Sequence, residues 1–283
     1  MFDFPIGVLI DSFKMDTETA LKKTADMGAD GFQMYATSGI YAPENMTGEK
    51  RREFLSLVKD YGLKVSALCG DLGQGFGNKE KNPELIEKSK KIVELAKDLE
   101  TNIITTHIGV VPEDKNHERY KIMQEACFEL SRFADSMEAH FAIETGPETA
   151  IVLKEFLDSL GSRGVAVNLD PANFVMVTGD DPVQAVYTLK DYIVHTHAKD
   201  GRKLLDVHPE IVYRVIEDEV KQRGKAFIEL PLGEGDVDFD NYLKALEEIG
   251  YKGFLTIERE VGENPEQDIV KAYEFLKNKI SVL

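Results

Sequence analysis

The stretch Gly253-Phe-Leu-Thr-Ile-Glu-Arg-Glu260 joins a short apolar run to an acid, Glu258, placed where the run ends. Three earlier apolar runs end in the same way, on a residue that can bind a metal ion. They are Ala142-Ile-Glu-Thr-Gly146, Val167-Asn-Leu-Asp-Pro171 and His195-Thr-His-Ala-Lys-Asp200. Runs of this length and character are typical of buried strands. The four stretches therefore predict a metal site at one end of a sheet, formed by Glu144, Asp170, His197 and Glu258.

Short apolar runs alternate with amphipathic segments along the whole chain. The expected strands are residues 5–10, 31–35, 64–69, 102–107, 141–144, 165–170, 193–199 and 254–258. The expected helices are residues 17–27, 50–61, 83–99, 117–137, 150–160, 182–189, 209–223, 241–250 and 267–279. Strands alternating with helices indicate a parallel sheet, and eight such units in 283 residues are typical of a (β/α)₈ TIM barrel. We predict one α/β domain over residues 1–283, with an open doubly wound sheet as the alternative.

A further apolar run, residues 226–230, does not fit the count of eight strands. We place it in the connection after the seventh strand, ahead of a helix that Asp238 could cap.

Composition restricts the functional classes. The formal net charge of −17 opposes nucleic-acid binding, which depends on clustered Lys and Arg. No apolar run reaches the roughly 20 residues of a membrane span, and the N-terminus lacks the basic start and apolar core of a signal peptide. We therefore expect a cytoplasmic protein that binds neither membranes nor nucleic acid.

Side chains alternate between the interior of a barrel and its helix layer. If Ile143 faces the helices, Glu144 faces the interior, and the same test places Asp170 and Glu258 inside. Three carboxylates and one imidazole are costly to bury unless a shared cation neutralises them. This oxygen-rich set favours Mn²⁺, Mg²⁺ or Co²⁺ over Zn²⁺, although zinc remains open. The alternative is that each acid pairs with a neighbouring base, for which Arg259 and Lys199 are available.

The order of these motifs resembles the xylose isomerase-like barrel superfamily of sugar isomerases and 3-epimerases. The matching pieces are Ile143-Glu-Thr-Gly146, Leu169-Asp-Pro-Ala-Asn173, His195-Thr-His-Ala-Lys-Asp200, Leu232-Gly-Glu-Gly-Asp-Val-Asp-Phe239 and Glu248-Ile-Gly-Tyr-Lys-Gly-Phe-Leu-Thr-Ile-Glu258. The resemblance implies a metal held by Glu144, Asp170, His197 and Glu258. It also implies that the first and last of these move the proton. The chain departs from many ketose 3-epimerases at Asn173, where they carry a histidine that touches the sugar.

These features lead to a functional hypothesis: metal-dependent isomerisation or 3-epimerisation of a small sugar, by proton abstraction next to a carbonyl through an enediolate. Glu144 and Glu258 are the expected acid/base pair, since their strands are three apart around the ring and could flank a bound sugar. We expect His107, Glu148 and Lys199 to contact the substrate, although His107 could instead form a hydrogen bond across the barrel mouth. Residues 70–77, which are rich in glycine, form either a closing lid or a plain connection.

Two other functions remain open at the same site. One is dehydration of an inosose or related keto-polyol, which begins with the same proton abstraction and then expels a β-hydroxyl. The other is a sugar-binding barrel without turnover. The expected partner is a small sugar, and the acidic loop 260–265 favours an unphosphorylated one. The resemblance also suggests a homo-oligomer, because relatives are often dimers or tetramers.

Overall fold

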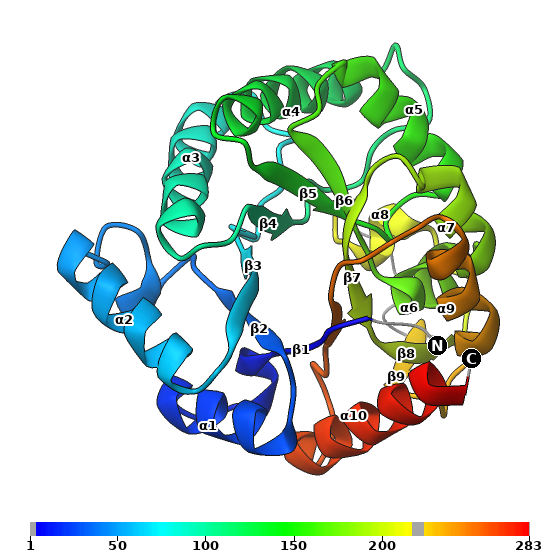
Figure 1. Cartoon of the computed structure of the whole chain (residues 1–283). Helices are drawn as coiled ribbons and strands as arrows, with labels where there is room; N and C mark the ends of the chain where they lie inside the picture. The colour runs from blue at the N-terminus through cyan, green and yellow to red at the C-terminus, as the bar shows by residue number, and fades with distance from the viewer. Residues whose placement is uncertain (1–3, 217–223, 283) are drawn as a thin grey trace.

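The computed structural model describes residues 4–216 and 224–282. Eight parallel strands close into a barrel in the order β1, β10, β7, β6, β5, β4, β3, β2, and helices surround it (Figure 1). The barrel strands are β1 (Ile6–Leu9), β2 (Gly31–Tyr35), β3 (Lys64–Cys69), β4 (Ile103–Thr106), β5 (His140–Glu144), β6 (Val165–Leu169), β7 (Ile193–Ala198) and β10 (Leu255–Ile257). The predicted (β/α)₈ barrel is confirmed, and the open sheet is excluded.

Most helices lie within a few residues of their predicted positions. The helices of the described chain are α1 (Thr17–Met27), α2 (Gly48–Asp60), α3 (Asn82–Asp98), α4 (Glu118–Ser136), α5 (Ala150–Leu160), α6 (Pro171–Asn173), α7 (Pro182–Leu189), α8 (Pro209–Val212), α9 (Phe239–Glu248) and α10 (Pro265–Val282). Of these, the short α6 was not predicted. Local signals explain several ends. Gly28 closes α1 with φ +90°, a conformation that glycine adopts readily, and the Asp238 carboxylate caps α9 by accepting from Asn241 N.

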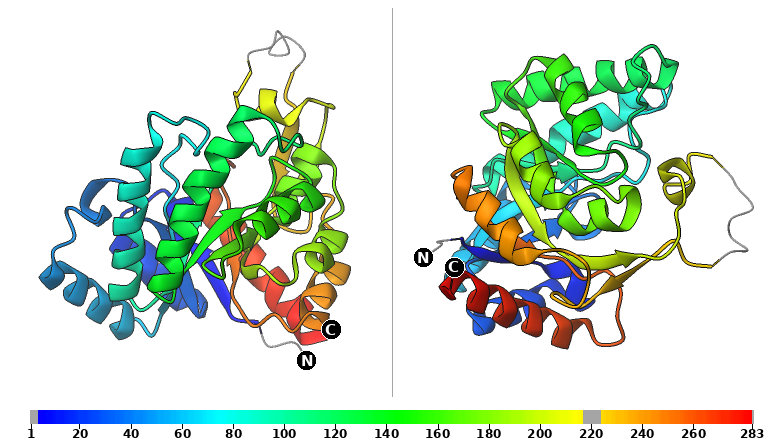
Figure 2. Two further views of the ribbon diagram at one scale, coloured as in Figure 1. Left: turned by 90° about the horizontal axis from the view of Figure 1, so that it is seen from above. Right: turned by 90° about the vertical axis from the view of Figure 1, so that its right-hand side faces the viewer.

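The region after β7 differs from the predicted pattern. β8 (Asp200–Lys203), which the sequence did not suggest, pairs antiparallel with β9 (Phe227–Leu230), outside the barrel. The placement of residues 226–230 in a connection is therefore confirmed. The helix predicted over 209–223 is wrong in extent, because α8 ends at Val212 and residues 217–223 lie outside the described chain. Figure 2 shows α8, in yellow, on the segment that joins β8 to β9, outside the ring of barrel strands.

The predicted alternation of side chains holds in the strands that carry the site. Ile143, Leu169 and Ile257 belong to the apolar core, whereas their neighbours Glu144, Asn168 and Thr256 form hydrogen bonds to polar side chains in the barrel. The core is continuous and includes large, fully buried side chains such as Phe141 and Phe156. No helix among residues 4–216 and 224–282 has the length and apolarity that a membrane crossing requires.

Candidate functional site

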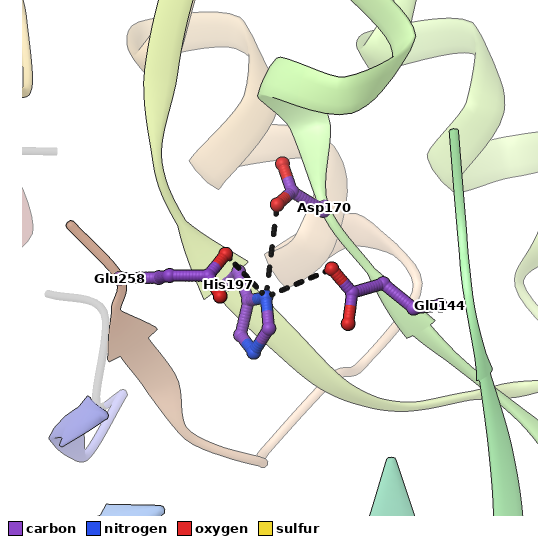
Figure 3. Close-up of side chains that lie close together, drawn as sticks. All are labelled: Glu144, Asp170, His197 and Glu258. Atoms are coloured by element: carbon purple, nitrogen blue, oxygen red, sulfur yellow. Dashed lines mark ion pairs between the residues drawn. The ribbon is translucent and has the colours of Figure 1, made fainter. Parts of the chain in front are cut away.

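The four predicted ligands converge at the carboxyl ends of their strands. Glu144 is the last residue of β5, Asp170 follows β6, His197 lies in β7 and Glu258 follows β10. One potential ligand atom from each residue lies within 4.8 Å of the others, and all four residues are buried. Figure 3 shows the three carboxylates directed toward one nitrogen of the imidazole. Parallel strands bring these side chains together because their carboxyl ends meet at one mouth of the barrel.

His197 Nδ1 is the centre of this cluster. It lies 3.1 Å from Glu258 Oε2, 3.6 Å from Glu144 Oε1 and 3.6 Å from Asp170 Oδ2. These separations are longer than metal–ligand bonds and comparable to the distances between two ligands of one ion. A divalent cation therefore fits among the four groups after small side-chain adjustments.

Two buried atoms of the cluster have no hydrogen-bond partner among the described residues: Asp170 Oδ2 and His197 Nδ1. The other oxygen of Asp170 accepts from the backbone N–H groups of Ala172 and Asn173, which fixes the carboxylate at the start of α6. Buried polar atoms in native proteins are nearly always satisfied. The unpartnered oxygen and nitrogen, facing each other, therefore fit a site that holds a cation.

A layer of polar side chains inside the barrel orients His197. Gln33 Nε2 donates to Thr105 Oγ1 at 2.7 Å, which leaves Gln33 Oε1 to accept from His197 Nε2 at 2.9 Å. The proton of the neutral imidazole is then on Nε2, and the Nδ1 lone pair is free for a metal. Sequence reasoning missed Gln33, because a single glutamine in an otherwise apolar strand gives no recognisable motif.

The rest of this layer continues to β10. His195 Nδ1 lies 2.9 Å from Asn168 Oδ1, and its Nε2 lies 2.9 Å from Thr256 Oγ1. Burial and neighbouring His197 lower the pKa of His195 well below its usual value, so this imidazole is neutral. Asn168 Nδ2 also approaches Glu144 Oε2 at 3.4 Å. His195 is therefore a structural neighbour of the cluster and not one of its four members.

The cluster holds a proton strongly when no cation is bound. Burial alone would lower the pKa of His197, but the Glu258 and Glu144 carboxylates outweigh it and raise that pKa well above the usual value. Burial also raises the pKa of Asp170. A cation and the imidazole proton therefore compete for the same space and the same negative charge.

Lys199 lies at the edge of the cluster. Its Nζ is 3.0 Å from Glu258 Oε2 and 3.8 Å from Asp170 Oδ2. Glu258 therefore forms the ion pair with a neighbouring base that the sequence left open as an alternative, and Lys199 also lies near Asp170. Arg259 instead pairs with Glu229 and Asp268, away from the four ligands. Three carboxylates are balanced when Lys199 and one divalent cation are both present.

His107 bridges the cluster and the loop at residues 70–77. Its Nε2 lies 3.7 Å from Glu144 Oε1 and its Nδ1 lies 3.3 Å from Asp71 Oδ2. Burial opposes ionisation, but Glu144 and Asp71 raise the pKa of His107 to about 9. The loop is also tied to the segment after β4, because Phe76 N donates to the Ile108 carbonyl. His107 is therefore a cation at neutral pH, held beside Glu144.

Glu148 lies in the loop between β5 and α5, and its side chain is buried. Glu148 Oε2 accepts a hydrogen bond from Val111 N at 3.3 Å, whereas Oε1 has no partner among the described residues. Burial raises the pKa of Glu148 to about 8. Its carboxyl group is therefore mostly protonated at neutral pH and can donate a hydrogen bond.

Two further residues belong to the surroundings of the cluster. Asn173 Nδ2 donates to Glu144 Oε1 at 3.3 Å and to the Thr145 carbonyl at 3.2 Å. Asn173, which stands where many ketose 3-epimerases carry a histidine, therefore helps to orient the Glu144 carboxylate. Tyr213, just after α8, places its ring 6.0 Å from that of His107. Sequence reasoning missed Tyr213, because it lies in an irregular segment between β8 and β9, where no periodic pattern shows which side chain contacts the barrel.

The chain is a (β/α)₈ barrel with three carboxylates and one imidazole at its mouth, a group of side chains that could hold a cation. Residues 21–279 match the family model of the xylose isomerase-like TIM barrel, and the chain belongs to this family.

Individual relatives cover the chain to different extents. An uncharacterized protein of Methanocaldococcus jannaschii is 23% identical and spans 100% of this chain and 92% of its own. An inosose dehydratase of Clostridium botulinum is 27% identical, over 59% of this chain and 57% of that enzyme. Among solved structures, a xylose isomerase domain protein from Planctomyces limnophilus has a TM-score of 0.79 and 27% identity, covering 98% of this chain and 96% of that one.

A cation and a proton compete for His197 Nδ1, so cation binding is expected to depend on pH. Only the neutral imidazole can bind a cation, so Mn²⁺ binding is expected to release about one proton near neutral pH. The affinity is expected to rise with pH, by up to about tenfold per unit, for as long as free His197 is protonated. Titration calorimetry in buffers of different ionisation enthalpy measures both quantities.

Asp170→Asn is expected to weaken Mn²⁺ binding at least about tenfold, because it removes a charged ligand. The matched control is Asp26→Asn, which changes an exposed carboxylate paired with Lys22. Equal affinities for the two variants, or an affinity independent of pH, would contradict the proposed ligand set.

Proposed function

We propose that the protein is a metal-dependent isomerase or 3-epimerase of a small, unphosphorylated ketose. The observation that carries this proposal is the placement of Glu144 and Glu258 on opposite sides of His197 Nδ1. Their strands, β5 and β10, are separated by β6 and β7 in the ring. We propose Glu144, Asp170, His197 and Glu258 as the metal ligands, with Mn²⁺, Mg²⁺ or Co²⁺ preferred by this oxygen-rich set.

The chemical difficulty is the removal of a proton from carbon next to a carbonyl group. A bound divalent cation would supply electrostatic stabilisation of the negative charge that develops on the enediolate. The protein supplies the base. Burial raises the pKa of Glu258, but the charges of Lys199 and His197 outweigh burial and hold this pKa well below its usual value. Glu258 is therefore ionised at neutral pH, which is the form that can accept a proton.

We assign to Glu144 the return of a proton on the other face of the sugar. Burial opposes ionisation of Glu144, but His107 and His197 lower its pKa overall. The His107 imidazolium, 3.7 Å from Glu144 Oε1, is a proton donor within reach of that carboxylate after a small movement. Transfer by one glutamate and return by the other inverts the carbon centre. We place Lys199 and His107 beside the substrate oxygens as well.

Dehydration of a keto-polyol is the second candidate. It is favoured by the similarity to the inosose dehydratase of Clostridium botulinum, which spans 57% of that enzyme. It is also compatible with His107, since expulsion of a β-hydroxyl needs a proton donor, and the raised pKa of His107, about 9, provides one at neutral pH. Both candidates begin with proton abstraction by the same carboxylate.

The first experiment tests the base. Glu258→Gln keeps a similar shape and an oxygen ligand but removes the basic group. We expect the folded, Mn²⁺-loaded variant to lose roughly 10²–10⁴-fold of the rate at which solvent deuterium enters a ketose next to its carbonyl. The measurement is NMR of a panel of free ketoses in deuterated water, with Mn²⁺ content determined on the same samples.

The matched control is Glu263→Gln, an exposed acid in the loop after β10, which is expected to exchange at the wild-type rate. Exchange by metal-loaded Glu258→Gln at the rate of this control would remove the proposed role of Glu258.

A second experiment separates the two candidate reactions. Incubation with a keto-inositol in deuterated water is expected to give no enone, because the primary proposal returns the proton and expels no hydroxyl. Ultraviolet absorbance detects the enone as it forms. A metal-dependent rise in that absorbance would assign the protein to the dehydratases instead.

A further inference from the structure

A cavity of about 680 Å³ opens on the side of the barrel that carries the metal ligands. Its walls come from the segments that follow β4 and β5 and from residues 206–210, which follow β8. Residues along it include Val110, Pro112, Pro147, Thr149 and Val207, together with Glu148. This volume lies in the range of roughly 300–1,000 Å³ that small-molecule sites occupy. The proposed reaction uses only the four ligands and their immediate neighbours, so most of this space has no assigned role.

One residue of the cavity wall, Glu148, also belongs to the surroundings of the metal centre. Glu148 borders the cavity and lies in the loop that follows Glu144, the last residue of β5. His107 lies 3.7 Å from Glu144 Oε1 on one side, and its charge acts on the Glu148 carboxyl on the other. Tyr213 packs its ring 6.0 Å from that of His107. A molecule at the metal centre that extended as far as Glu148 would therefore reach the cavity wall.

Two buried polar atoms at the cavity have no partner among the described residues, namely Glu148 Oε1 and Arg119 Nε. The Glu148 side chain is more than nine-tenths buried, so its free oxygen is not satisfied by bulk water. An atom of this kind in a wall of the cavity indicates a ligand that supplies a hydrogen-bonding group. The neutral carboxyl of Glu148 suits a hydroxyl, which both donates and accepts.

The charges along the cavity disfavour an anionic ligand. Arg119 forms an ion pair with Glu210, and Lys203 forms one with Asp206. Glu113 and Asp114 also line the cavity, which leaves an excess of acid. A phosphate or carboxylate would meet repulsion instead of a free cation. The valine and proline walls instead suit the apolar C–H faces of a sugar ring, with hydroxyl groups directed at the few polar atoms.

We propose that this cavity is a second sugar subsite, so that the substrate is a glycoside of the reacting ketose with an uncharged second sugar unit. This inference rests on the proposed function, because it takes the first unit to lie at the metal centre. Glu148 then contacts the second unit at the boundary between the two sites. The cavity supplies binding energy to a two-unit substrate that a free monosaccharide cannot use.

Binding of sugars of one and two units to the Mn²⁺-loaded protein tests the proposal. The probes are D-fructose and the glucosyl-fructoses maltulose and isomaltulose, measured by titration calorimetry. At least one glucosyl-fructose is expected to bind roughly tenfold or more tightly than D-fructose, because the second sugar unit makes additional contacts with the cavity. Thr149→Phe places a ring in the cavity at a helix cap whose side chain makes no capping hydrogen bond. It is expected to abolish the preference and leave D-fructose binding within about twofold.

Val207→Phe places a ring at another residue of the cavity wall and is used if Thr149→Phe does not fold. Equal affinity for all three probes, or a preference that both filled variants retain, overturns the subsite. Deuterium exchange is followed separately on the same samples. If deuterium exchange proceeds but the two-unit probes bind no more tightly than D-fructose, the subsite is overturned and the proposed reaction is still supported. A preference that the filled variants abolish, without metal-dependent exchange on any probe, supports the subsite and counts against the proposed reaction.

Discussion

The carboxylates of Glu144, Asp170 and Glu258 meet around a single imidazole nitrogen, inside a barrel from which bulk water is almost excluded. Three like charges at this separation repel one another strongly in a medium of low polarity. Lys199 compensates one of them, and a proton on His197 compensates a second. A divalent cation would replace that proton and neutralise the remainder. Charge compensation is therefore the constraint that the surrounding structure has to meet.

Much of the barrel interior serves this constraint. A cluster of charges can be held in a fixed position only if the side chains beneath it are themselves fixed. Gln33 sets the tautomer of His197, and Asn168 and Asn173 each donate to Glu144. Asp170 is held through one oxygen by the first turn of α6, and its other oxygen has no hydrogen-bond partner in the part of the chain that the structure describes. The polar layer thus fixes the ligands before a cation arrives, which lowers the cost of binding it.

The barrel and its four ligands could be predicted because both depend on short-range periodicity. Apolar runs mark strands, alternation assigns each side chain to the interior or the helix layer, and parallel strands bring their ends together. Lys199 was expected near these acids, but the carboxylate that it meets, Glu258, could not be predicted in this way, because β7 ends at Ala198 and the chain then turns into β8. Tyr213 and the cavity beside Glu148 depend on contacts between distant segments. No local pattern in the sequence records such contacts.

The central claim is that one cation sits among these four side chains, and anomalous X-ray scattering from a crystal soaked in Mn²⁺ tests it most directly. The account predicts a single strong anomalous peak with Glu144, Asp170, Glu258 and His197 Nδ1 all within about 2.0–2.4 Å. Lys199 would remain beside Glu258 and outside the coordination sphere. A map without a peak at this position, or with the Lys199 ammonium occupying the space between the carboxylates, would contradict the account.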